Sequence, residues 1–140
     1  MKSDVWFTNG KRRMPFTMKI LIIEPHKHPR RAEIPHTLED MQKTVGGYIE
    51  VTYPFAEDPV GLVCDEEGLY KDTEWNRYIC PGVAIKGTFF LCGLGEEDLS
   101  DLPDELMEKY EKLLWEPHIF VRTLKGPMVI TGNGKTVPIS

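Results

Sequence analysis

The chain has 140 residues, of which 41% are hydrophobic and 28% are charged, as expected for a globular protein with one core. No apolar run approaches the roughly 18 residues that cross a bilayer, and no signal peptide is recognisable, so we expect a cytoplasmic protein. The net charge is −5, but residues 37–116 alone carry nineteen acids against six Lys/Arg. Such an acidic body argues against broad binding to duplex DNA, which needs a positive face.

Both ends of the chain are basic. Residues 1–36 carry eight Lys/Arg against three acids, and residues 117–140 carry three Lys/Arg and no acid. Two interpretations remain open: the ends fold back onto the acidic body or a partner copy, or a basic arm contacts an anionic ligand.

The first seventeen residues form either a basic arm or a short hairpin around the Asn9-Gly10 turn. Residues 18–23 are almost continuously apolar, which predicts a strand covered on both faces and makes Met18 a second candidate translation start. Thr37 and Asp40 resemble a capping box for a short helix over 38–45. Gly46 supplies its left-handed stop.

Strands are predicted over 48–53 and 60–64, and an acidic turn, Asp65-Glu66-Glu67-Gly68, follows. We expect residues 69–82 to be irregular. Residues 83–94 give the longest strand pattern in the chain, and Lys86-Gly87 within it indicates a bulge or a close backbone approach.

A second helix is predicted before Glu116-Pro117. Ser100 or Asp101 is the expected N-cap, and Pro103 is expected in the first turn. The predicted buried stripe consists of Leu106, Tyr110, Leu113 and Leu114. The remaining residues, from His118 to Ile139, alternate as β structure and contain a hairpin signal at Asn133-Gly134.

These elements predict an α+β fold: a small, mostly antiparallel sheet with two helices and a C-terminal β-hairpin extension. We expect three parts, namely an arm or hairpin over 1–17, a core domain over 18–115, and an extension over 116–140. The extension is expected to pack on the core or on a partner copy, and its apolar strands favour a homodimer.

Cysteine and histidine spacing gives no reason to expect a metal or a cofactor. Cys64, Cys80 and Cys92 lack a CxxC pair and are interpreted as buried, reduced thiols. His26 and His28 lack a third ligand at a recognisable spacing, so a solvated loop is expected. The acidic turn does not match a calcium-binding loop.

Several short motifs occur in a recognisable order. They are the strand that enters Glu24-Pro25, Leu38 with Met41-Gln42, VGGYIE at 45–50, LVCDEEG at 62–68, Asn76-Arg77, and the Gly87-Thr88 strand with Gly93. Over residues 18–114 the chain resembles the family catalogued as domain of unknown function 3846, whose members occur in bacteria, phages and mobile elements. The resemblance implies a small α+β domain and a mobile-element setting, and it implies no reaction. The first seventeen residues and the tail depart from the pattern.

The acidic turn and the Asn76-Arg77 pair form the leading candidate ligand site. Arg77 offers a planar donor fork suited to carboxylate or phosphate, and Asn76 offers an amide for a base edge. In the structural alternative, Arg77 clamps the 69–82 segment to carboxylates of the turn. Aromatic residues near these positions are either a platform for a base or core residues. The candidate ligand-binding set is Arg77, Asn76, Glu66, Asp65, Trp75 and Tyr48.

Three classes of function follow. The favoured one is a non-catalytic phage or mobile-element accessory protein that sequesters a small nucleotide signal or blocks a host or defence protein. The second is a small nucleotide-acting enzyme that uses the acidic turn and Arg77. The third is a nucleic-acid-binding regulator that uses the basic arm. No catalytic residues are assigned, because no nucleophile motif is present.

Overall fold

The computed structural model describes residues 16–130 and 134–139. The expected N-terminal arm or hairpin falls almost wholly outside this range, as does Asn133 of the C-terminal turn. Within the described part the elements are β1 Thr17–Ile23, β2 Arg30–Pro35, α1 Leu38–Val45, β3 Ile49–Thr52, β4 Val60–Asp65, the 3₁₀ turn η1 Gly68–Tyr70, β5 Trp75–Cys80, β6 Val83–Lys86, β7 Phe89–Leu94, β8 Leu99–Ser100, α2 Asp104–Leu113, β9 Ile119–Thr123, β10 Gly126–Ile130 and β11 Thr136–Pro138.

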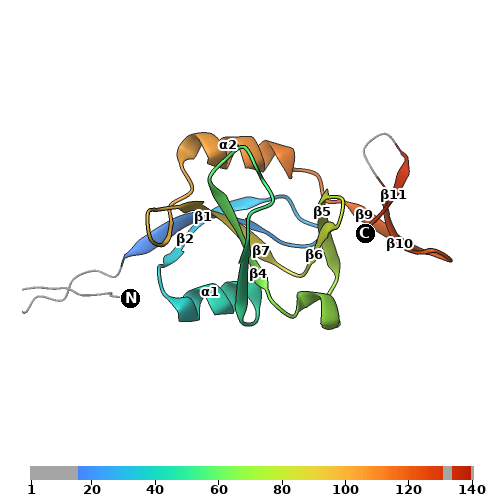
Figure 1. The fold of residues 1–140 in the computed structure, drawn as a ribbon, viewed down its shortest axis with the longest axis horizontal. Helices are drawn as coiled ribbons and strands as arrows, with labels where there is room; N and C mark the ends of the chain where they lie inside the picture. Colours follow the sequence, from blue (N-terminus) through green and yellow to red (C-terminus); the bar gives the residue numbers. More distant parts are fainter. Residues whose placement is uncertain (1–15, 131–133, 140) are drawn as a thin grey trace, which may run out of the picture.

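The core is one antiparallel sheet between two helices. The strand order is β2-β1-β7-β4-β3, and β8 pairs with β7 beside this path. Helix α2 covers one face and α1 covers the other (Figure 1). This arrangement confirms the predicted α+β class with a mostly antiparallel sheet and two helices.

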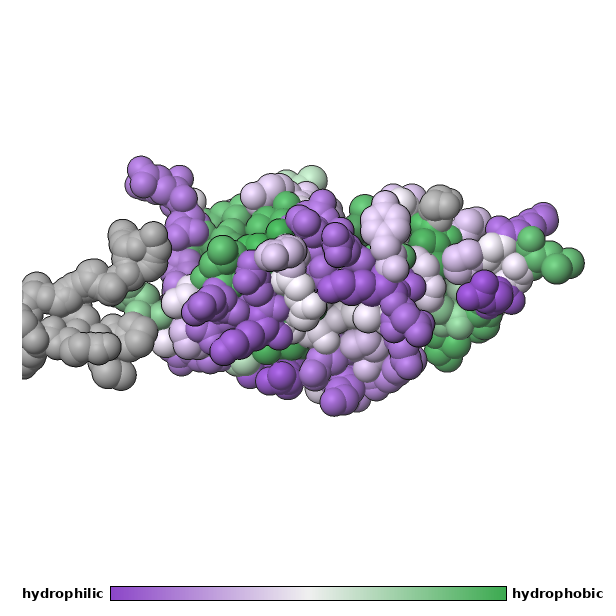
Figure 2. Space-filling view, turned by 90° about the horizontal axis from the view of Figure 1, so that it is seen from below, coloured by the Kyte–Doolittle hydropathy of each residue, from purple (hydrophilic) through white to green (hydrophobic). Residues whose placement is uncertain are grey.

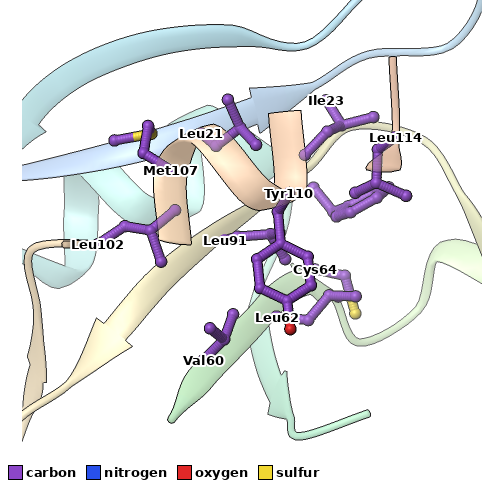
Figure 3. Packing of buried hydrophobic residues seen from close by; sticks show 11 residues of the cluster. Leu21, Ile23, Val60, Leu62, Cys64, Leu91, Leu102, Met107, Tyr110 and Leu114 are labelled. Atoms are coloured by element: carbon purple, nitrogen blue, oxygen red, sulfur yellow. The ribbon is translucent and has the colours of Figure 1, made fainter. Parts of the chain in front are cut away.

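Both faces of the central strands are apolar because both are covered. In β1, Leu21 and Ile23 face α2, whereas Ile20 and Ile22 face α1, as the period of two requires. Figure 3 shows Tyr110 and Met107 projecting from α2 onto the sheet. The cluster under α2 contains Leu21, Ile23, Val60, Leu62, Cys64, Phe89, Leu91, Leu102, Met107, Tyr110 and Leu114. The cluster under α1 contains Met18, Ile20, Ile22, Met41, Val45, Val63, Phe90 and Cys92.

Helix α1 has the predicted ends. The Thr37 hydroxyl accepts a hydrogen bond from the Asp40 amide at 3.1 Å. Gly46 has φ of +86° and its N–H donates to Gln42 O, so it ends the helix in the left-handed conformation. The glycine is therefore a helix stop and not part of a phosphate-binding loop.

Helix α2 begins later than expected. Pro103 occupies the N-cap position, so the prediction of Ser100 or Asp101 as the cap was wrong. The reason is tertiary: β8 pairs with β7, and the Asp101 carboxylate accepts a hydrogen bond from the Lys19 amide at 2.9 Å. Of the predicted buried stripe, Tyr110 and Leu114 are buried and Leu106 is partly buried, but the prediction of Leu113 was wrong: it is 61% exposed, and Met107 is buried instead.

The segment expected to be irregular, 69–82, contains most of η1 and all of β5. The single strand predicted over 83–94 is divided into β6, which pairs with β5, and β7, which enters the central sheet. Gly87 separates them: its φ is +78°, and its N–H donates to Glu74 O at 2.8 Å. A backbone turn that favours glycine therefore ends one sheet and begins another.

The C-terminal strands form a three-stranded sheet, β11-β10-β9, beside the β5–β6 hairpin (Figure 1). Phe120 stacks on Trp75 with ring centroids 5.6 Å apart, and the Gly82 amide donates to Ile139 O at 3.3 Å. The tail thus contacts the core of its own chain. Figure 2, which looks at the α1 side, shows a mostly hydrophilic body with one hydrophobic area at its left, and further hydrophobic residues over the C-terminal strands at its right.

Candidate functional site

The acidic turn is held by a lysine, not by Arg77. Lys71 Nζ donates to Asp65 Oδ2 at 2.6 Å and to Gly46 O at 3.1 Å, and the Glu67 amide donates to Asp65 Oδ1 at 3.0 Å. Burial raises the pKa of Asp65, but these hydrogen bonds outweigh that effect and the pKa is lowered overall. The turn is therefore anchored to the end of α1, and Glu66 remains exposed.

Arg77 is fully buried, and its side chain donates hydrogen bonds mainly to backbone carbonyls. Its Nη2 donates to Lys27 O at 2.7 Å and to Leu114 O at 3.0 Å, and its Nε donates to Leu114 O at 3.1 Å. Its Nη1 donates to Asn76 Oδ1 at 2.9 Å. The expected clamp between Arg77 and the carboxylates of Asp65 or Glu66 is therefore not formed, because β5 carries the guanidinium under α2.

Asn76 is 1% exposed and completes this network. Its Nδ2 donates to Ile23 O at 2.9 Å and to Gly87 O at 2.7 Å. The pair Asn76-Arg77 thereby joins the end of β1, the β6–β7 turn and the end of α2. In this arrangement neither side chain presents a free donor to solvent.

The structure distributes the six candidate residues rather than gathering them. Asp65 and Glu66 line a cleft between β3, β4 and β6, which we name the β3–β6 cleft. Trp75 lines a second groove, between the start of β5 and the residues around β9, which we name the Trp75 groove. Tyr48, 68% exposed, lies on a third surface beside the end of α1.

The β3–β6 cleft has a volume of about 400 Å³. Its lining residues are Glu50, Thr52, Tyr53, Pro54, Cys64, Asp65, Glu66, Gly68, Leu69, Gly82, Val83, Ala84, Ile85 and Lys86. The Cys64 thiol at its floor is buried, which raises its pKa to about 11, with the charges of Glu50 and Asp65 adding to the effect. The thiol is thus protonated and inert as a nucleophile at neutral pH.

The Trp75 groove is larger, at about 610 Å³, and joins the core to the tail. Its lining residues are His26, Asp72, Thr73, Glu74, Trp75, Lys86, Pro117, His118, Ile119, Phe120 and Arg122. The stacked pair of Trp75 and Phe120 forms an aromatic wall, and Lys86 Nζ lies 5.4 Å from the centroid of the Trp75 ring. Arg122 is exposed.

His118 has a fixed tautomer in this groove. The Tyr78 amide donates to its Nδ1 at 2.8 Å, so the ring proton of the neutral imidazole resides on Nε2. Burial and, to a smaller extent, the positive charge of Arg77 lower the pKa of His118. The ring is therefore neutral at pH 7 and offers an Nε2–H donor.

His26 and His28, in the loop between β1 and β2, contact other parts of the protein. His28 Nδ1 donates to Trp115 O at 2.7 Å, its ring stacks on Trp115 with centroids 4.1 Å apart, and His26 hydrogen-bonds Glu74. Across residues 16–130 and 134–139, no three His, Cys, Asp or Glu side chains gather as a metal site. In the same ranges, no helix is long and apolar enough to span a membrane.

Sequence reasoning did not identify His118, Phe120, Arg122 or Lys86 as site residues. Three of them belong to the tail, more than forty residues after Trp75 in the chain, and only folding brings them beside β5. The one available signal was the basic character of residues 117–140, and this charge alone does not predict where the tail lies in the fold.

Comparison with known proteins gives a single result. The model for the domain of unknown function DUF3846 matches residues 18–114. No curated protein and no solved structure matches the chain significantly. The matched residues run from β1 to the C-cap of α2. They therefore cover the central sheet with its two helices, the β5–β6 hairpin and the β3–β6 cleft. Since this span is more than half of the chain, the protein belongs to the DUF3846 family.

Proposed function

We propose that the protein acts by binding and not by catalysis, and that the Trp75 groove holds a small anionic nucleotide. The observation that carries this proposal is the aromatic wall of Trp75 and Phe120 beside the exposed cation Arg122. The Lys86 ammonium, which donates to Lys71 O, adds positive charge at the edge of the groove. Aromatic side chains provide faces for bases, and cations attract phosphate. The groove volume of about 610 Å³ lies within the usual range of ligand pockets.

The chemistry of His118 supports binding over catalysis. A general base needs an unoccupied lone pair within reach of the substrate. In His118 the Nδ1 lone pair is occupied by the Tyr78 amide, and Nε2 bears the proton. The imidazole is therefore suited to donating a hydrogen bond to a phosphate or carbonyl oxygen, and not to removing a proton.

The acids on the groove rim favour a nucleoside over a bare phosphate. Glu74 and Asp72 line the same groove as Lys86 and Arg122, so its charge is mixed. Carboxylates can accept hydrogen bonds from the amino groups of a base, whereas an isolated inorganic anion would be repelled by them. The mixed lining therefore fits a ligand with a base at one end and a phosphate at the other.

The phage and mobile-element setting implied by the family resemblance favours a role in the host cytoplasm against a host defence. Sequestering a nucleotide signal removes it from its receptor without chemistry, and this requires only tight binding. The competing possibility, that the protein blocks a host or defence protein directly, is favoured by a separate surface, the β3–β6 cleft.

Calorimetric titration with nucleoside mono-, di- and triphosphates and with cyclic nucleotides tests the proposal. We expect at least one of them to bind and to be recovered unchanged. Phe120→Leu should weaken binding about tenfold, since base stacking is worth roughly 1–3 kcal/mol, and Arg122→Ala should reduce the salt dependence of binding. The matched control is Lys125→Ala, a cation on the same hairpin that does not line the groove. Absence of binding across the panel, or turnover of the ligand, would overturn the proposal.

A further inference from the structure

The β3–β6 cleft lies within the family domain, apart from the Trp75 groove. We propose that this cleft binds an extended, basic segment of a partner protein, which adds as a strand to the free edge of β6. This inference does not depend on the nucleotide proposal, since the two sites share only Lys86 among their lining residues. Four observations support it: the unpaired edge of β6, the apolar and hydroxyl-bearing residues that line the cleft, the carboxylates at its rim, and the acidic composition of residues 37–116.

The edge of β6 faces the cleft. All four strand residues from Val83 to Lys86, together with Gly82, line it without alternation. A strand that presents a face to a cavity contributes every second residue, as β3 does here with Glu50 and Thr52. Consecutive lining residues therefore mean that the backbone edge of β6 borders the space.

That edge has no strand beside it in the described part of the chain, where β6 pairs with β5 alone. Its ends are covered: η1 lies against Lys86 O, and the Gly82 amide donates to Ile139 O. The part open to another strand is therefore the middle, from Val83 to Ile85. An unpaired edge presents a row of backbone N–H and C=O groups, which is a template for adding another strand. Recognition of this kind takes affinity from main-chain hydrogen bonds and specificity from pockets for alternate side chains.

The floor of the cleft suits an extended peptide. It combines apolar surface from Val83 and Ile85 with Thr52. Thr52 Oγ1 is buried and has no hydrogen-bond partner in residues 16–130 and 134–139. A buried hydroxyl without a partner costs free energy, and rotation of the Thr52 side chain toward an incoming amide or carbonyl would remove that cost.

The charged residues that line the cleft favour a basic ligand. Three carboxylates line the cleft against one ammonium group, and the Asp65 carboxylate is already paired with Lys71. Glu50 and Glu66 are exposed. The ammonium of Lys86 is turned toward the backbone, where it donates to Lys71 O at 3.2 Å. Two carboxylates are thus placed to pair with Lys or Arg side chains on alternate positions of a bound strand.

The part of the chain that contains the cleft is negatively charged, like the cleft itself. Residues 37–116 carry nineteen acids and six Lys/Arg, so the approach of a basic protein is favoured and that of a nucleic acid or of a second copy of this domain is opposed. Basic extended segments are common on proteins that bind nucleic acid, and one of these is the class of partner that the cleft fits.

Binding of a synthetic peptide measured by fluorescence anisotropy tests the inference. The probes are a labelled peptide of alternating Arg and Val, the same peptide with Glu in place of Arg, and the Arg peptide N-methylated at alternate amides. We expect the Arg peptide to bind, the Glu peptide not to bind, and N-methylation to weaken binding tenfold or more. Equal binding of the N-methylated peptide would overturn strand addition, because a simple cation site does not need the amides.

Variants of the protein locate the site. Glu50→Gln with Glu66→Gln should weaken binding of the Arg peptide about two- to thirtyfold, since each exposed ion pair is worth roughly 0.2–1 kcal/mol. The matched control, Glu96→Gln with Glu97→Gln, removes the same charge from exposed positions outside the cleft and should change binding little. Equal weakening by both pairs would mean a diffuse electrostatic attraction and would overturn the site. Arg122→Ala should leave peptide binding unchanged, which separates this test from the nucleotide test.

Discussion

Arg77 and Leu114 are joined by two hydrogen bonds, in which Nε and Nη2 of a buried guanidinium donate to one carbonyl oxygen at 3.1 and 3.0 Å. Leu114 is the C-cap of α2, so the positive charge lies at the negative end of the helix dipole. Burial lowers the pKa of Arg77 to about 10, so the side chain remains charged at neutral pH. The most polar residue of the core therefore acts as a helix cap.

Replacement of Arg77 should destabilise the protein strongly. Arg77→Met leaves the buried carbonyl of Leu114 and the partly buried carbonyl of Lys27 without these donors, and an orphaned buried group costs about 1–3 kcal/mol. We expect a loss of about 3 kcal/mol or more in urea unfolding. Arg77→Lys should recover only part of it, since one ammonium cannot reproduce the planar fork. Arg31→Met, which removes an exposed arginine paired with Glu111, is the control and should shift the midpoint little. Equal midpoints for the Arg77 and Arg31 variants would contradict the capping role.

Local signals in the sequence were sufficient for the elements whose ends are chemically defined. Thr37, Asp40 and Gly46 specify both ends of α1 without help from other elements, and the unbroken apolar run of β1 required cover on both faces. The same reasoning failed at Ser100 and Asp101, which have side chains suited to an N-cap. In the structure Ser100 pairs with β7, and the Asp101 carboxylate accepts a hydrogen bond from the Lys19 amide. Tertiary pairing decided where α2 begins.

The site residues were harder to predict because charge does not reveal burial. Arg77 follows an acidic turn closely in sequence, which favoured an ion pair, yet β5 turns it into the core while the nearer cation Lys71 takes the carboxylate of Asp65. The Trp75 groove depends on Phe120 and His118, which no local pattern connects to β5. Contacts between residues so far apart require the fold.

Gly93 should not accept even alanine. A Cβ at Gly93 would lie 2.1 Å from Asp101 O, a backbone atom fixed beside β8. We expect Gly93→Ala to cost roughly 3 kcal/mol or more, as overpacking that displaces backbone does, and to lower the melting temperature sharply. Gly46→Ala is the matched control: its Cβ would meet nothing within 4 Å, so only the positive φ costs stability, about 1–2 kcal/mol. A Gly93→Ala variant as stable as Gly46→Ala would show that β8 does not hold its place against β7.

The phenol of Tyr110 should contribute through one hydrogen bond. Tyr110 is 1% exposed, and its hydroxyl donates to Asp58 Oδ2 at 2.6 Å, which ties the loop before β4 to α2. Tyr110→Phe keeps the buried ring and removes only this bond, so we expect a loss of about 1–2 kcal/mol in thermal unfolding. Tyr70→Phe, at a phenol that is 87% exposed, should have no measurable effect. If both variants melted at the wild-type temperature, the Asp58 contact would contribute nothing to stability.

His118 should make the protein less stable in mild acid. Because the pKa of His118 is lowered by folding, the unfolded chain binds a proton more readily than the folded one. Stability is therefore fully present above the unfolded pKa of about 6.5 and is lost as the pH falls from there toward the lower folded value. The main cause is burial, which disfavours the charged imidazolium, and the positive charge of Arg77 adds repulsion. Protonation of Nδ1 would also remove the acceptor of the Tyr78 amide. Urea unfolding at pH 7.5 and pH 5 should show this loss in the wild type and a smaller one in His118→Asn, whose amide oxygen can accept from Tyr78. The control Tyr70→Phe, at an exposed phenol that does not change charge between these pH values, should keep the wild-type pH dependence. An unchanged loss in His118→Asn would assign the effect to another group and remove the support for a neutral His118 donor.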